Sequence, residues 1–274
     1  MLLGIFAKTF AASEALASLE AVRQAGYSVA QFNLACLGLP SMPDAIAPPI
    51  ARSVAEASQK SGVAVPAVSG TYNMIHPDIA VRETGLRRLA VLIASARAMG
   101  VSTVTLCTGT RDARDLWRSH PDNRSAEAWR DLRTEMAKAV ALAEAHGVDL
   151  GVEPELANVV DCAEAARRMI EEIGSPRLRI VLDPANLAEV VSAEQRRTII
   201  DRSIDVLADR ISFAHAKDRD AAGGFVAAGR GVIDFPHFIR GLRRIGFNGP
   251  LIAHGLRESE APNVAKFLEG ALRA

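Results

Sequence analysis

Carboxylates and imidazoles follow four separate apolar runs in the second half of the sequence. They are Glu153 with Glu155, Asp183, His215 and His254. A carboxylate among apolar residues is costly to bury unless it is paired or binds a cation. Two carboxylates with one or two imidazoles form a ligand set that suits Mn²⁺, Zn²⁺, Mg²⁺ or Co²⁺. These residues therefore predict a divalent metal site, with Glu153, Asp183 and His215 as its core ligands.

Each of these residues also has an ordinary structural role open to it. Asp183 precedes Pro184 and is suited to beginning a helix, and His254 suits a half-buried histidine with a hydrogen-bonded ring. For any one residue, a helix cap or an ion pair is an equal alternative to metal binding. That alternative weakens when all the residues fall at the ends of consecutive strands.

The elements that must position these groups are short apolar runs alternating with longer helical stretches. The runs are rich in Val, Ile, Leu and Phe, which is typical of parallel strands buried on both faces. The expected strands begin at Leu2, Ser28, Val63, Ser102, Val148, Leu178, Arg210 and Gly249. Apolar residues recur three and four apart in the expected helices. These helices cover 13–24, 50–60, 80–99, 125–146, 161–172, 192–208, 235–244 and 258–273.

This alternation predicts an α/β fold, a single (β/α)₈ barrel that takes in residues 1–274 as one domain. The rival is an open doubly wound sheet, which usually has a glycine-rich phosphate loop after its first strand. Here Lys8, Thr9 and Phe10 occupy that position. In a barrel the carboxyl ends of the strands face the active site, so the polar residues are expected to meet there.

Composition limits the partners that we expect. The formal net charge is +0, which gives no indication of a nucleic-acid or membrane partner. No apolar run is long enough to cross a membrane. The cysteines are Cys36, Cys107 and Cys162, an odd number without zinc-knuckle spacing. We therefore expect reduced thiols in a cytoplasmic protein.

Five motifs resemble those of a known superfamily. They are GVEPE (Gly151 to Glu155), LDPANL (Leu182 to Leu187), AHAKD (Ala214 to Asp218), GRGVIDF (Gly229 to Phe235) and GPLIAHGL (Gly249 to Leu256). Their order and spacing resemble the xylose isomerase-like barrels, which include sugar phosphate isomerases and epimerases and the endonuclease IV group. The resemblance covers essentially the whole chain. It implies a carbohydrate substrate and assigns Glu153, Asp183 and His215 as metal ligands.

The resemblance also implies substrate-binding residues, namely His76, Glu155, Asn186 and Arg230. The loop that carries His76 follows the third strand and is expected to overhang the barrel mouth. For Arg230 the alternative is a solvated loop cation. For Lys217, a structural ion pair with Asp218 or Glu153 is an alternative to a substrate contact.

Two positions depart from the family pattern. Relatives usually have a glutamate at the end of strand eight, where this chain has His254. An imidazole can ligate a metal and carry a proton near neutral pH, but it lacks the geometry of a carboxylate base. Many relatives have a histidine where this chain has Asn186, which can hydrogen-bond a substrate hydroxyl but cannot transfer a proton.

The resulting hypothesis is a metal-dependent isomerase or epimerase that acts on a ketose, polyol-derived or sugar-acid substrate through an enediolate. Glu153 would remove a proton from the carbon next to the carbonyl. His254 would be the second acid–base group or a fourth ligand, and Lys217 or His76 would protonate an oxygen.

Three alternatives stay open at this stage. The same first step would serve a lyase, either a dehydratase or a decarboxylase, acting on a keto sugar or an inosose. His254 and Asn186 also allow a sugar-binding barrel without catalytic activity. An abasic-site endonuclease needs a zinc cluster rich in histidine, and Asn186 removes one of its ligands. Homo-oligomers are common among relatives, although no segment of this sequence identifies an interface.

Overall fold

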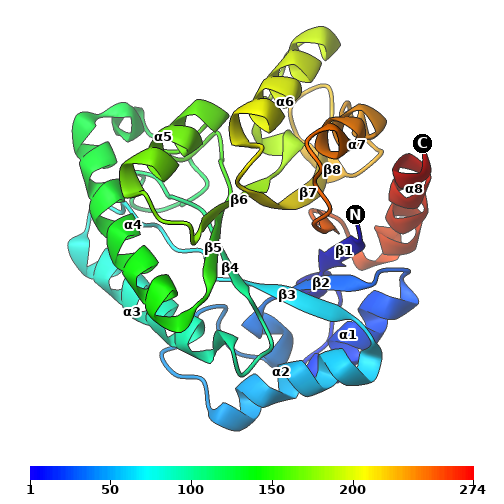
Figure 1. The fold of residues 1–274 in the computed structure, drawn as a ribbon, viewed down its shortest axis with the longest axis horizontal. Coiled ribbons are helices and arrows are strands. Elements are labelled where there is room, and N and C mark those ends of the chain that lie inside the picture. The colour runs from blue at the N-terminus through cyan, green and yellow to red at the C-terminus, as the bar shows by residue number, and fades with distance from the viewer.

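A closed ring of parallel strands forms the centre of the computed structural model, which describes residues 1–274 (Figure 1). The ring consists of β1 (Leu3–Phe6), β2 (Val29–Phe32), β3 (Ala64–Ser69), β4 (Thr103–Leu106), β5 (Asp149–Val152), β6 (Leu178–Leu182), β7 (Ile211–Arg219) and β9 (Leu251–Ala253). Neighbouring strands pair in parallel from β1 to β7, and β9 closes the ring between β7 and β1. The predicted (β/α)₈ barrel is confirmed.

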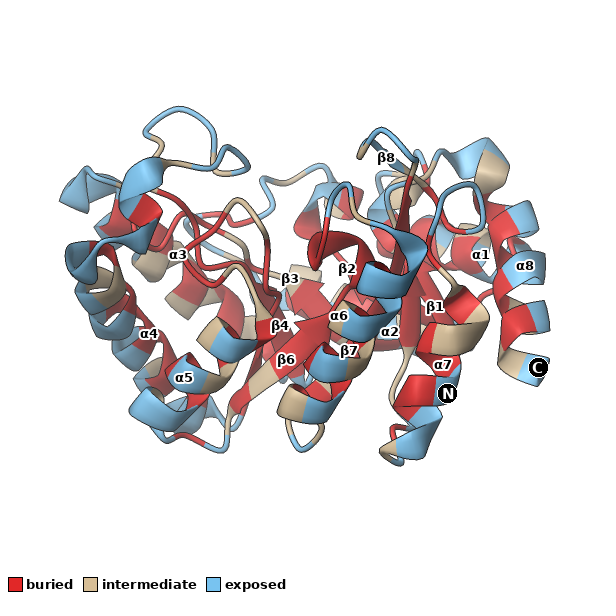
Figure 2. Ribbon diagram, turned by 90° about the horizontal axis from the view of Figure 1, so that it is seen from above, coloured by how far each residue is buried: buried red, intermediate tan, exposed pale blue.

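Eight helices surround the strands. They are α1 (Ala15–Gln24), α2 (Pro48–Ser61), α3 (Ile79–Ala96), α4 (Ala126–His146), α5 (Ala163–Ile173), α6 (Ala193–Leu207), α7 (Phe235–Arg244) and α8 (Ala261–Arg273). Four of them begin at a side chain that accepts a backbone N–H, namely that of Asp78, Ser125, Ser192 or Asp234. Figure 2 shows buried inner faces against the strands and exposed outer faces. None of the helices is both long and apolar enough to cross a membrane.

Two apolar clusters stabilise the barrel. The larger one, of 72 buried residues, includes the packing between strands and helices. The smaller one fills the inside of the ring and consists of Val29, Ala67, Val181, Phe213 and Ile252. Glycines make room within it, because a Cβ on Gly4 would lie 2.5 Å from Ile252 Cδ1. The inside of the barrel is therefore a packed apolar floor.

A ninth strand, β8 (Phe225–Ala227), was not predicted from the sequence. It pairs antiparallel with the end of β7, with Lys217 opposite Ala227 and Arg219 opposite Phe225. It follows a polar turn, and a strand of three residues is too short to show an alternation of apolar and polar residues in the sequence. The hairpin extends beyond the barrel rim (Figure 2). Within it, the ring of Phe225 lies beside Lys217, whose ammonium is 3.9 Å from the ring centroid.

We expect Gly85→Ala in α3 to lower the free energy of unfolding by about 1–3 kcal/mol, because it overpacks the loop after β3. A Cβ on Gly85 would lie 2.1 Å from Tyr72 Cδ2, and Tyr72 is buried. Gly270→Ala in α8 is the matched control, since its Cβ would meet no atom within 4 Å. The control should gain up to about 1 kcal/mol from helix propensity. Urea denaturation measures both, and equal stabilities would contradict this packing.

Candidate active site

The candidate site lies directly above the apolar floor. Successive side chains of a strand point to opposite faces, so residues two apart share a face. Val181, Phe213 and Ile252 belong to the floor, and Asp183, His215 and His254 follow them by two positions. In the same way, Glu153 follows Gly151 of β5. The alternation of the strands thus aims these polar side chains into the carboxyl end of the ring.

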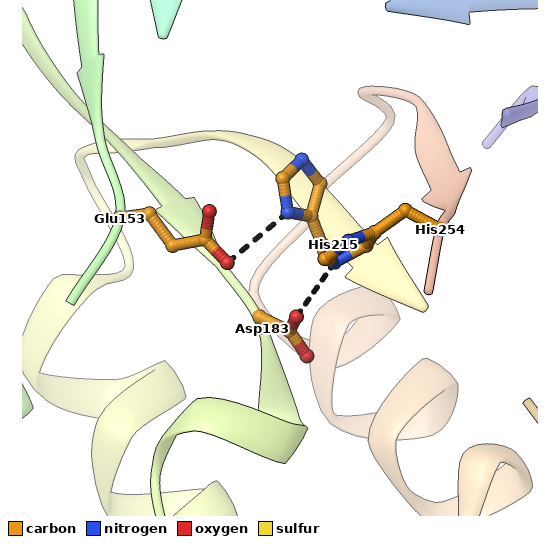
Figure 3. A group of neighbouring side chains, drawn as sticks. All are labelled: Glu153, Asp183, His215 and His254. Atoms are coloured by element: carbon orange, nitrogen blue, oxygen red, sulfur yellow. Dashed lines mark hydrogen bonds and ion pairs between the residues drawn. The ribbon is translucent and has the colours of Figure 1, made fainter. Parts of the chain in front are cut away.

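The structure brings Glu153, Asp183, His215 and His254 together in one cluster. One potential ligand atom from each residue lies within 4.8 Å of the others. Glu153 Oε1 is 3.2 Å from His215 Nδ1, and Asp183 Oδ2 is 2.9 Å from His254 Nε2 (Figure 3). Asp183 also fills the structural role considered above, because its Oδ1 accepts the N–H of Ala185 at 2.9 Å. One oxygen therefore begins a short helical turn while the other faces the cluster.

Gln31 orients His215 and was missed by the sequence analysis. In the structure, the Gln31 amide nitrogen donates to Ser69 Oγ at 3.1 Å and to Thr105 Oγ1 at 2.9 Å. Its Oε1 lies 3.0 Å from His215 Nε2, so a proton on Nε2 can be donated to it. In that tautomer Nδ1, 3.2 Å from Glu153 Oε1, would be free to bind a metal. A ligand nitrogen whose ring is oriented by a second hydrogen bond fits a divalent metal site.

Asn186 lies behind the cluster and is fully buried. Its amide nitrogen donates to Glu153 Oε1 at 2.7 Å and to Glu155 Oε1 at 2.6 Å. Asn186 thus fixes the positions of two carboxylates that would otherwise repel each other. It does not line the cavity described below, so the structure gives it a positioning role in place of the expected contact with substrate.

Lys217 reaches the cluster from β7. Its Nζ lies 3.5 Å from Asp183 Oδ2 and 3.9 Å from Glu155 Oε1. Burial alone would lower the pKa of Lys217, but the charges of the neighbouring carboxylates, led by Asp183, outweigh burial and raise it. Lys217 is therefore an ammonium whose partners are Asp183 and Glu155. The ion pair with Asp218 or Glu153 considered as an alternative does not form.

The carboxyl groups of the cluster differ in their affinity for protons. Burial, together with the charge of Glu153, raises the pKa of Glu155 to about 8. Burial also acts on Asp183, but Lys217 and His254 outweigh it and hold the pKa of Asp183 well below its usual range. Burial lowers the pKa of His254, with His215 adding to the effect and Asp183 opposing it. Asp183 as an anion and His254 as a neutral ring are the forms that a metal requires of its ligands.

Residues 19–271 match the family described as xylose isomerase-like TIM barrel. The chain belongs to this family. The match includes every residue of the cluster and all the strands except β1. No curated protein matches the sequence.

Solved structures resemble this xylose isomerase-like barrel along its whole length. The 3-keto-D-glucoside 4-epimerase of E. coli has a TM-score of 0.77 at 14% identity, covering 98% of this chain and 99% of that one. A D-tagatose 3-epimerase-like protein has a TM-score of 0.78 at 16% identity, covering 100% and 97%. An L-ribulose 3-epimerase has a TM-score of 0.75 at 20% identity, covering 99% and 94%. At these identities the likeness establishes the fold alone.

A cavity of about 490 Å³ opens above the cluster of this xylose isomerase-like barrel. Glu153, Glu155, Lys217 and His254 line its polar side. The apolar walls are Phe6, Leu116, Trp117, Leu156 and Phe225. Phe6 stacks on the His254 ring with centroids 4.7 Å apart, and the Lys217 ammonium lies 3.9 Å from the centroid of Phe225. Aromatic walls around a few convergent polar groups are typical of a small-molecule site.

Two of the residues predicted to bind substrate lie away from the cluster. The His76 ring accepts the N–H of Asp78 at 3.0 Å and lies 3.2 Å from the carbonyl oxygen of Ala113. His76 therefore joins two loops at the rim and does not line the cavity. Arg230 lines a neighbouring chamber and not the cavity itself. Of the four predicted substrate-binding residues, only Glu155 lines the cavity.

We expect Asn186→Leu to lower the free energy of unfolding of the metal-free protein by about 2–4 kcal/mol. The reason is that two buried carboxylates would lose hydrogen bonds from an amide donor. Asn263→Leu, at an exposed position of α8, is the matched control and should change stability by about 0.5 kcal/mol or less. Chemical denaturation in EDTA measures both proteins. An Asn186→Leu protein as stable as its parent would contradict the positioning role.

Proposed function

We propose that this protein is a divalent-metal-dependent sugar isomerase or epimerase that acts on a ketose, polyol-derived or sugar-acid substrate. The observation that carries the proposal is the set of four potential ligands within 4.8 Å of one another at the base of a cavity. Further support comes from similar structures that are named as epimerases of a 3-keto-glucoside, L-ribulose and D-psicose. Mn²⁺, Zn²⁺, Mg²⁺ and Co²⁺ all suit the donor set.

Glu153, Asp183, His215 and His254 would hold the metal. A divalent cation supplies Lewis-acid polarisation of a carbonyl and an adjacent hydroxyl, and it stabilises the charge of an enediolate. In the protein, Glu153 Oε1 is occupied by Asn186 and His215, whereas Oε2 has no hydrogen-bond partner. Because Glu153 also lines the cavity, we assign it as the base that removes the proton next to the carbonyl.

Lys217 and His254 take the remaining roles. The Lys217 ammonium lines the cavity beside Asp183, so it can donate to a substrate oxygen. His254 Nε2 faces Asp183 Oδ2 within the cluster, which favours a role as the fourth ligand over that of a mobile acid–base group. Glu155 lines the same cavity and would hydrogen-bond a substrate hydroxyl.

We expect MnCl₂ to stabilise the EDTA-treated protein by about 2.7 kcal/mol at a hundred times the Kd, since the metal binds only the folded state. Asp183→Asn should abolish this gain. Asp205→Asn, an exposed carboxylate paired with Arg244, is the control and should retain it. Gln31→Leu should weaken the metal affinity roughly 10- to 100-fold, because it releases the ring of His215. If none of the four cations stabilised the native chain, the metal assignment would be wrong.

Proton exchange tests the reaction directly. We expect the metal-loaded protein in D₂O to place deuterium on the carbon next to the carbonyl of a substrate from a panel of D-tagatose, D-psicose, D-fructose and L-ribulose. Glu153→Gln should slow this incorporation about 100-fold or more, because the base is lost. The exposed Glu56→Gln is the control.

The products separate the candidate functions. NMR detection of an epimer or an aldose with incorporated deuterium supports the proposal, whereas incorporation with loss of water indicates the lyase alternative. Sugar binding without exchange indicates a non-catalytic barrel. Full turnover by a Glu153→Gln protein that binds metal normally would contradict the base assignment.

A further inference from the structure

A second chamber, of about 730 Å³, adjoins the cavity above the metal cluster. The two share Phe6, Lys8, Phe225 and His254, so they meet at the stacked rings of Phe6 and His254. The outer walls of the second chamber come from the segment after β8 and the segment after β9. A substrate with its reacting carbons at the cluster can therefore extend past these rings into the second chamber.

The second chamber contains two cations without carboxylate partners. Lys8 and Arg230 line it, both are exposed, and neither forms an ion pair with any carboxylate of the chain. A third cation, Arg257, is neutralised by Glu260, whose carboxylate lies 3.2 Å from Nε and 3.3 Å from Nη2. The net charge that the chamber presents to a ligand is consequently positive.

The loop that carries Arg230 is held in one conformation by Asp218. The N–H groups of Gly229 and Gly231 both donate to Asp218 Oδ2 at 3.0 Å, one on each side of Arg230. Gly229 has a φ of 83°. A Cβ on Gly231 would lie 2.0 Å from the carbonyl oxygen of Arg219. Arg230 thus projects from a fixed backbone, although its own side chain is exposed.

We propose that this chamber binds an anionic substituent, a carboxylate or a phosphate, on the sugar that reacts at the metal cluster, with Lys8 and Arg230 as its cationic partners. The reference to a reacting sugar rests on the proposed function. Guanidinium groups bind carboxylates and phosphates through paired hydrogen bonds, and an ammonium adds a point charge. In (β/α)₈ barrels, the loops after the last two barrel strands are a frequent position for an anion site. Substrate charge is therefore a determinant of specificity here.

The first experiment measures anion binding without a sugar. Isothermal titration of the metal-free chain with sulfate should show binding that falls about tenfold in Lys8→Gln and in Arg230→Gln. Lys266→Gln and Arg240→Gln are matched controls, because each removes an exposed cation that has no carboxylate partner and lies outside the chamber. The controls should bind sulfate as the native chain does. Equal sulfate binding by all five proteins would overturn the proposal.

The second experiment compares three ketohexose ligands that differ at one end, namely D-fructose, D-fructuronate and D-fructose 6-phosphate. The metal-loaded native protein should bind one of the two anionic ligands about tenfold or more tightly than D-fructose, and each chamber variant should reduce that preference about tenfold. The affinity of Arg230→Gln for D-fructose should not change, because Arg230 does not line the cavity above the cluster. Whichever anionic ligand is preferred identifies the group as a carboxylate or a phosphate.

The two experiments separate this inference from the proposed function. Deuterium exchange on neutral ketoses, with no preference for an anionic ligand and no effect of Lys8→Gln, would overturn the anion chamber and leave the proposed function standing. Sulfate binding that depends on Lys8 and Arg230, with no exchange on any ketose, would support the chamber and overturn the proposed function.

Discussion

The site depends on the burial of three carboxylates at one end of an apolar barrel. Glu153, Glu155 and Asp183 are all buried, and Lys217 is the one ammonium that contacts them. Three ionised carboxylates are unfavourable in a medium of low dielectric constant, and burial together with the charge of Glu153 raises the pKa of Glu155 to about 8. The surrounding groups compensate in part. Asn186 donates to Glu153 Oε1 and Glu155 Oε1, and a ring nitrogen of each histidine faces a carboxylate oxygen, His215 that of Glu153 and His254 that of Asp183. A divalent cation would complete this neutralisation, which explains why the cluster suits one.

The fold provides the positions at which this charge can be held. The alternation of the strands places an apolar or glycine residue two positions before each member of the cluster, so the floor and the site belong to the same faces of the same strands. Hydrogen bonds between parallel strands then set the height of each residue in the ring. Phe213 and His215 are an example, because the packing that fixes Phe213 also fixes the direction of His215.

Sequence analysis could predict the residues whose positions follow from the alternation of strands and helices. Glu153, Asp183, His215 and His254 each end or follow an apolar run, and a barrel brings such ends together. Gln31 could not be found in this way, since it lies within a buried strand and its role depends on contacts with Ser69, Thr105 and His215. The ion-pair partners of Lys217 could not be predicted from the sequence either. The Asp218 carboxylate accepts backbone N–H groups from the loop that follows the β7–β8 hairpin. Lys217 therefore pairs with Asp183 and Glu155 instead of Asp218.

His254 belongs both to the cluster of potential ligands and to the second chamber. With a neutral imidazole in that position, the ligand set contains two carboxylates, Glu153 and Asp183, whose charge a divalent cation would balance. A glutamate there would add one negative charge next to the wall that separates the two chambers. His254 and Phe6 form part of that wall, Arg230 lies beyond it, and Lys8 lines both cavities. Because charges attract or repel over several ångströms, removal of a carboxylate and the presence of two unpaired cations act in the same direction. Both make this end of the barrel more favourable for an anionic sugar than a third carboxylate at position 254 would.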